Sequence, residues 1–163
     1  MNDFNIYYMK QAILQAKKAA AIGETPIGAV IVHDNKIIAR AYNKRETKKS
    51  PLCHAEIIAI QKAAKKLGGW RLPDCAMYVT LEPCPMCAGA IIQSRIDNVY
   101  FGAYDDKNGC CGSKIDLFEK GLFYYNVEIN GGILEDECKE LLQSFFKNLR
   151  EQKRKRRITE NEI

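Results

Sequence analysis

Apolar side chains in several segments of the chain recur with the period of an α-helix. Near the N-terminus, Ile6, Met9 and Ile13 fall on one face of a helix and Gly23 follows as a stop signal, so we predict a helix over residues 5–22. The same kind of pattern, with glycines or prolines at its boundaries, predicts three more helices. They are expected over residues 54–67, from 83 to about 94, and from 135 to about 156.

Between these helices lie short runs of apolar and β-branched residues, which are typical of strands. One run covers residues 27–32 and another covers residues 36–41, and the Asp34-Asn35 pair between them has the chemistry of a turn, so the two runs predict a hairpin. Further strands are expected over residues 76–81, 98–103 and 124–130. Since helices and strands interleave, we predict an α/β fold, namely a three-layer α/β/α sandwich whose central mixed sheet has about five strands.

Length and composition fit one globular domain over residues 1–163. A chain of 163 residues is long enough to bury a core, and 47% of its residues are hydrophobic while 28% are charged. No apolar run approaches the roughly 18 residues that a membrane-spanning helix needs. The segment Met1–Lys10 lacks the pattern of a signal peptide. We therefore expect a cytoplasmic protein with no membrane partner.

The basic character of the chain is confined to its C-terminal end. The net charge is +5, but residues 147–157 carry seven basic side chains and one acidic one, residues 158–163 carry two acidic ones, and residues 1–146 contribute only +1. A basic helix end at about 147–163 is typical of proteins with a polyanionic partner. The same block also fits a solvated helix end, where Lys and Arg oppose the negative end of the helix dipole.

Two short motifs carry the candidate chemistry, the sequence HAE at 54–56 and the sequence PCPMC at 83–87. One histidine and two cysteines give three zinc ligands, and three protein ligands are typical of a catalytic zinc because the fourth position stays open for water. Glu56 follows the histidine closely enough to move protons on and off that water. We therefore predict a hydrolytic zinc enzyme with one Zn²⁺ per chain, held by His54, Cys84 and Cys87.

The spacing within each motif fits ligands at the start of a helix. Cys84 and Cys87 are three positions apart, so on a helix their side chains share one face. His54 and Glu56 are two positions apart and would diverge within a regular helix, but they can converge where a helix begins. Free N–H groups at a helix N-terminus favour thiolates, and zinc lowers the pKa of its bound water to about 7.

Two other interpretations of these residues are open. Cys53 could join the three ligands in a closed structural zinc site, although adjacent residues rarely reach one metal and Glu56 would then have no role. The Cys84–Cys87 pair between a strand and a helix is also the context of a thioredoxin-like redox pair, which would leave the histidine and the glutamate unused. The seven cysteines, an odd number without a secretion signal, argue against a disulfide framework.

The two motifs together resemble the signature of zinc-dependent nucleoside and base deaminases, and further segments resemble the bacterial tRNA-specific adenosine deaminases in particular. Those segments are GETPIGAV at 23–30, CHAEI at 53–57, YVTLEPC at 78–84, CAGAI at 87–91, FGAYD at 101–105, GS at 112–113, GIL at 132–134 and the Phe145-Phe146 pair. The resemblance covers roughly residues 5–150. It implies a cytidine-deaminase-like fold, a homodimer, and hydrolysis of adenosine to inosine at the wobble position of a tRNA anticodon.

The resemblance also implies roles for residues of this chain. His54, Cys84 and Cys87 would bind zinc, and Glu56 would be the catalytic acid and base. The residues expected to contact the substrate are Asn43, Ile27, Pro26, Asp105, Lys107, Phe145, Phe146 and Arg150. Without the resemblance, the same positions would be interpreted as a loop asparagine, core and turn residues, a polar turn and a helix face.

The C-terminal part of the chain combines apolar and basic positions. Neighbouring residues on a helix point about 100° apart, so at least one of Phe145 and Phe146 is expected in the core. Arg150 and the basic stretch after it are expected to follow phosphates, with binding that weakens as salt rises. Tyr124-Tyr125-Asn126 stands where similar enzymes often have an Asn-His-Arg-like stretch, and its tyrosines could stack on splayed bases or simply pack.

Two rival functions are compatible with the same motifs. A deaminase of a free base or nucleoside, such as guanine or cytosine, could share the fold, but a small substrate would not need the basic C-terminal helix. A non-catalytic zinc module that only binds RNA would not need Glu56. Removal of residues 147–163 should leave the activity of a small-molecule deaminase intact, and Glu56→Gln should change nothing measurable in a non-catalytic module.

Overall fold

The computed structural model describes residues 3–161, with side chains as far as Ile158. Within that range, five strands form one sheet in the order β2-β1-β3-β4-β5, and four helices accompany it. The elements are α1 (Asp3–Ala21), β1 (Gly28–His33), β2 (Lys36–Tyr42), α2 (Ala55–Leu67), β3 (Cys75–Leu81), α3 (Pro85–Ser94), β4 (Asn98–Ala103), β5 (Glu128–Asn130) and α4 (Glu135–Asn161). The expected mixed sheet is confirmed, since β1 pairs antiparallel with β2 and β3, whereas β4 pairs parallel with β3 and β5.

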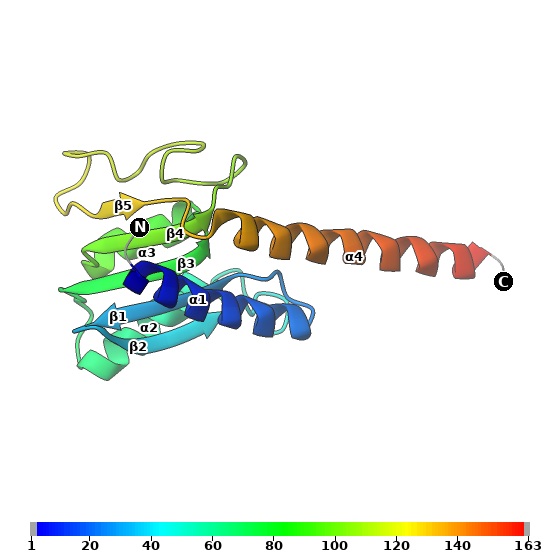
Figure 1. Cartoon of the computed structure of the whole chain (residues 1–163), viewed down its shortest axis with the longest axis horizontal. Helices are drawn as coiled ribbons and strands as arrows, with labels where there is room; N and C mark the ends of the chain where they lie inside the picture. The colour runs from blue at the N-terminus through cyan, green and yellow to red at the C-terminus, as the bar shows by residue number, and fades with distance from the viewer. Residues whose placement is uncertain (1–2, 162–163) are drawn as a thin grey trace.

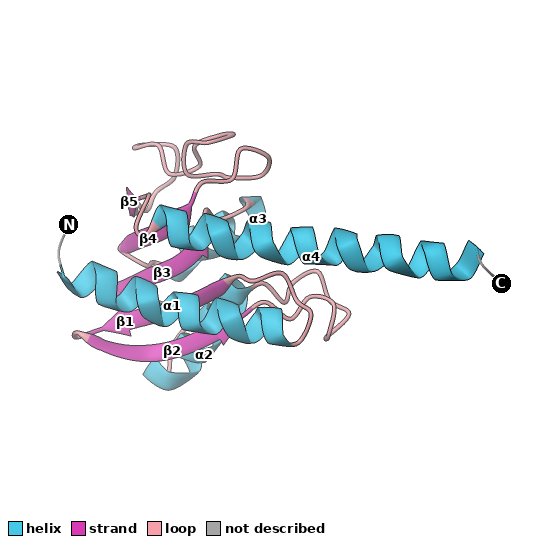
Figure 2. Cartoon of the chain, turned by 45° about the vertical axis from the view of Figure 1, so that its right-hand side comes forward, coloured by secondary structure: helices cyan, strands magenta, loops and turns pink. Residues whose placement is uncertain are grey.

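The helices lie in two layers, one on each face of the sheet (Figures 1 and 2). In β1, Ala29 and Ile31 belong to the buried cluster shared with α2 and α3. Val30 and Val32 belong to the cluster shared with α1 and the start of α4, as the alternation of side chains along a strand requires. The predicted α/β/α sandwich is therefore confirmed, and each of its two interfaces has its own apolar core.

The close approach of α1 to β1 depends on the absence of a side chain at Gly28. A Cβ atom at this position would lie 2.8 Å from Gln15 Cβ, and closer still to the Ala12 carbonyl oxygen and the Ala16 amide nitrogen. Glycine in a strand often marks such an approach of another backbone. The Gly28 amide donates a hydrogen bond to Thr80 Oγ1 (3.1 Å), which ties the start of β1 to the end of β3.

The strand expected over residues 124–130 is wrong in its first half, because only Glu128–Asn130 pairs with β4. Tyr124 is 96% exposed in the preceding loop. The hydroxyl of Tyr125 donates to the Arg95 carbonyl oxygen (3.2 Å) and also bonds the Asp97 carboxylate. These contacts hold the segment against the connection between α3 and β4, so the strand begins only after it.

Both helices that carry the motifs begin one or two residues later than predicted. α3 starts at Pro85 rather than Pro83, with Cys84 as its N-cap. The second proline of the motif therefore occupies the first helical position, where its missing N–H has no cost. α2 starts at Ala55, and His54 is its N-cap. The sequence alone did not distinguish the two prolines, since either could open a helix.

The last helix, α4, begins against the sheet and then projects beyond the rest of the molecule (Figure 1). It continues to Asn161, past the expected end near residue 156. Of the expected basic segment at 147–163, residues 162 and 163 lie outside the described range. Among the described residues, no helix combines the length and the apolar character needed to cross a membrane.

Candidate active site

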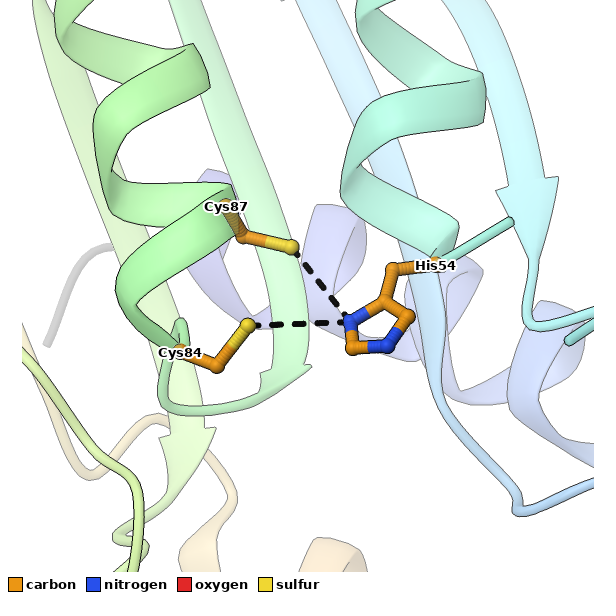
Figure 3. Close-up of side chains that lie close together, drawn as sticks. All are labelled: His54, Cys84 and Cys87. Carbon is orange, nitrogen blue, oxygen red and sulfur yellow. Dashed lines mark hydrogen bonds between the residues drawn. The ribbon is translucent and has the colours of Figure 1, made fainter. Parts of the chain in front are cut away.

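The three predicted metal ligands meet where α2 and α3 begin (Figure 3). His54 Nδ1 lies 3.7 Å from Cys84 Sγ and 3.5 Å from Cys87 Sγ. His54 and Cys84 are both N-cap residues with extended backbone, and neither side chain forms a hydrogen bond that caps its own helix. Each side chain can therefore turn away from its helix axis and toward the other helix.

The positions of the donor atoms fit a tetrahedral zinc ion. With Zn–S near 2.3 Å and Zn–N near 2.0–2.1 Å, a tetrahedron places nitrogen and sulfur ligands about 3.6 Å apart. Both distances from His54 Nδ1 agree with this value. Among the described residues, His54, Cys84 and Cys87 form a group whose ligand atoms all lie within 4.8 Å of one another. Cys53 is not part of the group, so the geometry does not support the closed four-ligand alternative.

Hydrogen bonding distributes the protons of the two cysteines unequally. The hydrogen bond with the Cys87 thiol lowers the pKa of Cys84 to about 4 despite its burial, and His54 contributes to the same effect. That pairing, together with burial, raises the pKa of Cys87 far above the ordinary value of a thiol. The hydrogen bond with Cys84 in turn raises the pKa of His54. The trio therefore favours a thiolate at neutral pH, and the thiolate is the form that binds metals.

Glu56 lies in the first turn of α2 with its carboxyl group inside the protein. Burial raises the pKa of this group. Within the described part of the chain, Glu56 Oε2 is the one buried side-chain oxygen or nitrogen without a hydrogen-bond partner. A buried polar atom without a partner is destabilising, and a catalytic role is one explanation for such an atom in a native structure. Its position beside the metal ligands suits it to hold a proton or a water molecule.

A pocket of about 330 Å³ opens over these residues. Its lining includes His54, Glu56 and Cys84 of the centre. Two of the predicted substrate residues, Ile27 and Asp105, line it as well. The lining also includes Arg45, Glu82 and Asn108, which were not predicted from the sequence. The structure thus brings the predicted catalytic glutamate, two of the predicted zinc ligands and two of the predicted substrate residues together in one pocket.

Two other predicted substrate residues lie near this pocket but not in its lining. Pro26 is buried beside Ile27. Lys107 is exposed, and its backbone N–H donates to Asp105 Oδ1 (3.0 Å). Lys107 therefore supports Asp105 through its backbone, while its ammonium group extends from the surface.

Asn43 is buried, and its amide is oriented by a carboxylate that the sequence did not single out. Asn43 Nδ2 donates to Glu24 Oε2 (3.2 Å), and the Thr47 amide donates to Glu24 Oε1 (2.6 Å). Burial raises the pKa of Glu24, but the hydrogen bonds from Thr47 and the charge of Arg45 outweigh it and hold the pKa below its ordinary value. Glu24 thereby fixes the loop that supplies Arg45 to the pocket.

Glu82, which lines the pocket, orients another loop in a similar way. Its buried carboxylate accepts hydrogen bonds from the backbone amides of Asp105, Cys111 and Ser113. Burial raises the pKa of Glu82, but a hydrogen bond from the Ser113 side chain and those from the backbone amides outweigh it and hold the pKa below its ordinary value. The signal that could have found Glu82 is an acidic residue placed directly after an otherwise apolar strand.

The predicted substrate residues on α4 lie outside the lining of this pocket. Phe145 is half-buried in a hollow between α4 and the end of α1, and Phe146 is 40% exposed. The expectation that at least one of them belongs to the core is wrong, because neither is part of the two buried clusters of the sheet. The helix that carries them projects beyond the rest of the molecule (Figure 1). Arg150 is exposed and shares a surface hollow with Arg154 and Arg157.

Comparison with known proteins adds an independent set of observations. Residues 1–150 match the family described as MafB19-like deaminase. The tRNA-specific adenosine deaminase of Bacillus subtilis is 51% identical over 147 residues, which cover 90% of this chain and 91% of the relative.

Solved structures give related matches. A structure from a study of A-to-I editing by tRNA:A34 deaminases at the wobble position of transfer RNA has a TM-score of 0.80 and 40% identity, covering 83% of this chain and 99% of that one. A guanine deaminase from Bacillus subtilis has a TM-score of 0.59 and 44% identity, covering 64% of this chain and 66% of that one.

Proposed function

Because the chain belongs to the MafB19-like deaminase family, we propose that it is a zinc-dependent tRNA adenosine deaminase, which hydrolyses adenosine to inosine at the wobble position of tRNA anticodons. The observation that carries the proposal is the unpartnered Glu56 carboxylate oxygen in a pocket that His54 and Cys84 also line, with Cys87 completing their group of candidate metal ligands. The choice of substrate is supported by a relative named tRNA-specific adenosine deaminase that matches 90% of this chain.

His54, Cys84 and Cys87 would hold the zinc ion, which when bound supplies Lewis-acid activation of the attacking water. Three protein ligands are the number found in catalytic zinc sites. Both cysteines belong to the start of α3, where free N–H groups stabilise thiolates. The ligand set therefore fits catalysis better than a purely structural role.

Glu56 has the position needed to move the protons of the reaction. In hydrolytic deamination, the oxygen of water bonds to C6 of adenosine, the bond between C6 and the amine breaks, and ammonia leaves as inosine forms. Glu56 takes a proton from the water and delivers it to the leaving amine. Among the described residues, Oε2 of Glu56 has no hydrogen-bond partner that would compete for this proton.

The pocket suits a base that has been turned out of an RNA loop. Ile27 offers an apolar surface, while Asp105 and Asn108 offer polar groups. Bases in a single-stranded loop are already partly unstacked, so turning one outward costs less than it would in a duplex.

The remaining predicted substrate residues extend this proposal from the pocket to the surrounding RNA. Asn43 and Lys107 lie on the two loops beside the pocket, and Pro26 supports Ile27 from the interior. On α4, Phe145 and Phe146 offer partly exposed aromatic rings. The exposed Arg150 and the basic residues after it would contact phosphates. The exposed or partly exposed members of this set, Lys107, Phe145, Phe146 and Arg150, form the proposed RNA-binding surface, and the buried Pro26 and Asn43 support it from the interior.

A homodimer and a cytoplasmic location belong to the same proposal. The segment 115–124 exposes several large apolar side chains, namely Ile115, Leu122, Phe123 and Tyr124. A group of exposed apolar residues is typical of an association surface, which supports a dimer. An enzyme that modifies tRNA works where tRNA is used, which supports the cytoplasm.

The second candidate function is the deamination of a free base, since a guanine deaminase is 44% identical and similar in structure over 64% of this chain. The projecting helix α4 favours RNA, because a small neutral substrate has no need of the seven basic residues within 147–157.

The test is inosine formation by the zinc-loaded protein on an anticodon stem-loop with adenosine at the wobble position. We expect inosine from the wild type and a loss of at least about 10²–10⁴-fold in Glu56→Gln at unchanged zinc content. Glu140→Gln, which changes an exposed glutamate on the first half of α4, is the matched control and should retain full activity.

Two outcomes would contradict the proposal in different ways. Deamination of guanine or cytosine, without inosine from the stem-loop, would favour the free-base deaminase. Binding of the stem-loop without turnover, unaffected by Glu56→Gln, would favour a non-catalytic zinc module.

A further inference from the structure

One segment of the pocket wall is held by a single carboxylate. In the segment 105–113, the amide of Asp105 donates to Glu82 Oε2 (2.9 Å), and the amides of Cys111 and Ser113 donate to Glu82 Oε1 (2.8 Å and 3.1 Å). The Glu82 side chain is only 2% exposed. Hydrogen bonds to an ionised acceptor are roughly twice as strong as neutral ones. The carboxylate is therefore the centre around which this segment folds.

The position of Glu82 is itself determined by the sheet. Glu82 directly follows β3, and its amide donates to the carbonyl oxygen of Ala103 at the end of the neighbouring strand β4 (2.9 Å). Gly109 passes so near that a Cβ atom there would lie 2.6 Å from the Asp105 carbonyl oxygen, and closer still to the Glu82 carboxylate. The strands therefore determine the position of Glu82, and the Glu82 carboxylate determines the conformation of the segment 105–113.

The segment in turn presents two polar side chains, Asp105 and Asn108, to the pocket. The Asp105 carboxylate accepts hydrogen bonds from the amides of Lys107 (3.0 Å) and Asn108 (3.2 Å). The Gly109 amide donates to the Asp105 carbonyl oxygen (2.8 Å). These bonds form a compact turn that is attached to Glu82 through the Asp105 amide, so a shift at Glu82 also moves the pocket wall.

We propose that Glu82 is a positioning residue for substrate binding, which holds the segment 105–113 in the conformation that receives the RNA. The inference rests on the proposed function and deepens it by naming the residue that prepares one wall of the pocket. Both carboxylate oxygens of Glu82 are engaged by backbone amides, so Glu82 acts through the segment. A wall that is already ordered spares the complex the entropic cost of ordering it on binding.

Glu82→Gln tests the proposal with little change in side-chain size. The glutamine amide has one acceptor oxygen and one NH₂ group, and in either orientation the NH₂ group faces at least one backbone N–H that needs an acceptor. In a Glu56→Gln background, we expect the Kd for the anticodon stem-loop to rise about tenfold or more. With Glu56 present, KM should rise by a similar factor while kcat changes less than about threefold.

Gly109→Ala disturbs the segment from the opposite side, because the new Cβ atom must displace the Glu82 carboxylate. It should raise KM in the same way without removing a charge. Gly69→Ala is its matched control, since a Cβ atom at Gly69 would meet no heavy atom within 4 Å. Glu140→Gln is the control for the change of glutamate to glutamine. Both controls should bind the stem-loop as the wild type does.

Hydrogen exchange followed by mass spectrometry reports the conformation of the segment without any substrate. In Glu82→Gln and Gly109→Ala, exchange should become faster within 105–113, while β3 and β4 stay protected and the zinc content stays unchanged. If Glu82→Gln does not fold, Gly109→Ala provides the same comparison.

Faster exchange in the segment together with raised Kd and KM supports the inference. Faster exchange with unchanged Kd and KM, or a loss of kcat alone, would give Glu82 a merely structural role and overturn it. A wild-type protein that binds no stem-loop would instead refute the proposed function, and the inference with it. The wild-type measurement therefore separates the two failures.

Discussion

The contact between α1 and the start of β1 makes Gly28→Ala a direct test of the packing that supports the pocket. The new methyl group would overlap the Ala12 carbonyl oxygen and the Ala16 amide nitrogen, and it would lie 2.8 Å from Gln15 Cβ. The first two are backbone atoms, so no side-chain rotation can relieve the overlap. α1 must instead move away from the sheet or lose helical hydrogen bonds at this turn.

The size of the effect follows from the way α1 is packed. Forcing an extra methyl group into a packed core costs about 1–3 kcal/mol, and a clash with backbone atoms places Gly28→Ala near the upper end, about 3 kcal/mol. Met9, Ala12 and Ala16 are fully buried on this helix, so a displaced α1 also loses apolar contacts. In a chain of this length the Tm falls by about 2–4 °C per kcal/mol, so we expect a fall of about 6–12 °C.

Thermal unfolding of the zinc-loaded protein, followed by far-UV circular dichroism, measures this change against Gly69→Ala. A Cβ atom at Gly69 meets no heavy atom within 4 Å. Surface changes of this kind usually stay within about 0.5 kcal/mol of the wild type, so the Tm of the control should move by at most about 2 °C. If Gly28→Ala is as stable as the control, the reasoning is refuted. In that case there would be space for a methyl group between α1 and β1 that the structure does not show.

Three further predictions concern the metal, the buried carboxylates and α4. Removal of zinc with a chelator should abolish inosine formation and lower the Tm. It should leave the far-UV circular dichroism spectrum intact, because the candidate zinc ligands lie outside the two buried clusters of the sheet. Loss of the spectrum would contradict this prediction. The folded state lowers the pKa of Glu24, so the stability that Glu24 contributes is present above its unfolded pKa of about 4.3 and is lost as the pH falls through the folded pKa. In urea unfolding, Glu24→Gln should therefore be less stable than the wild type at neutral pH and should lose less stability on acidification. An equal loss of stability in both proteins would contradict a lowered pKa of Glu24 in the folded state. Replacing Arg150, Arg154 and Arg157 by glutamate should weaken stem-loop binding and reduce the slope of log Kd against log salt by about 2, or about 0.7 for each phosphate contact; an unchanged slope would show that these side chains do not meet phosphates.

Residue type and spacing were sufficient to predict the cluster of candidate zinc ligands. His54, Cys84 and Cys87 are of the residue types that bind zinc, and the start of a helix is the one place where His54 and Glu56 can share a site. The structure brings the three candidate ligands together at the starts of α2 and α3, with Glu56 in the first turn of α2. The place of Glu82 directly after an apolar strand is visible in the sequence, but the roles of Glu24 and Glu82 are not, because their partners include backbone amides in loops and an amide carries no signature of its own.

The incorrect predictions have a common physical origin, since a local pattern does not specify its tertiary partner. The segment 124–130 has the composition of a strand, but β4 pairs with only three of its residues. The helical periodicity of the α4 sequence gives the directions in which Phe145 and Phe146 point, but it does not specify where the helix leaves the sheet. The pattern of β1 was predicted more fully because both faces of that strand are buried, and an unbroken apolar run is what such a strand requires.

The antiparallel pairing of β1 with β3 has a consequence for the order in which the chain folds. It places Ala29 opposite Val79, fifty positions along the chain, whereas the hairpin with β2 places Ala29 opposite Ala41. Distant pairings form more slowly than local ones, because more chain must be ordered before any contact is gained. Glu24 and Glu82 reach the same edge of the sheet only after the distant pairing forms. A newly synthesised chain halted before that step would expose the cysteines of the PCPMC motif without the histidine that completes their site.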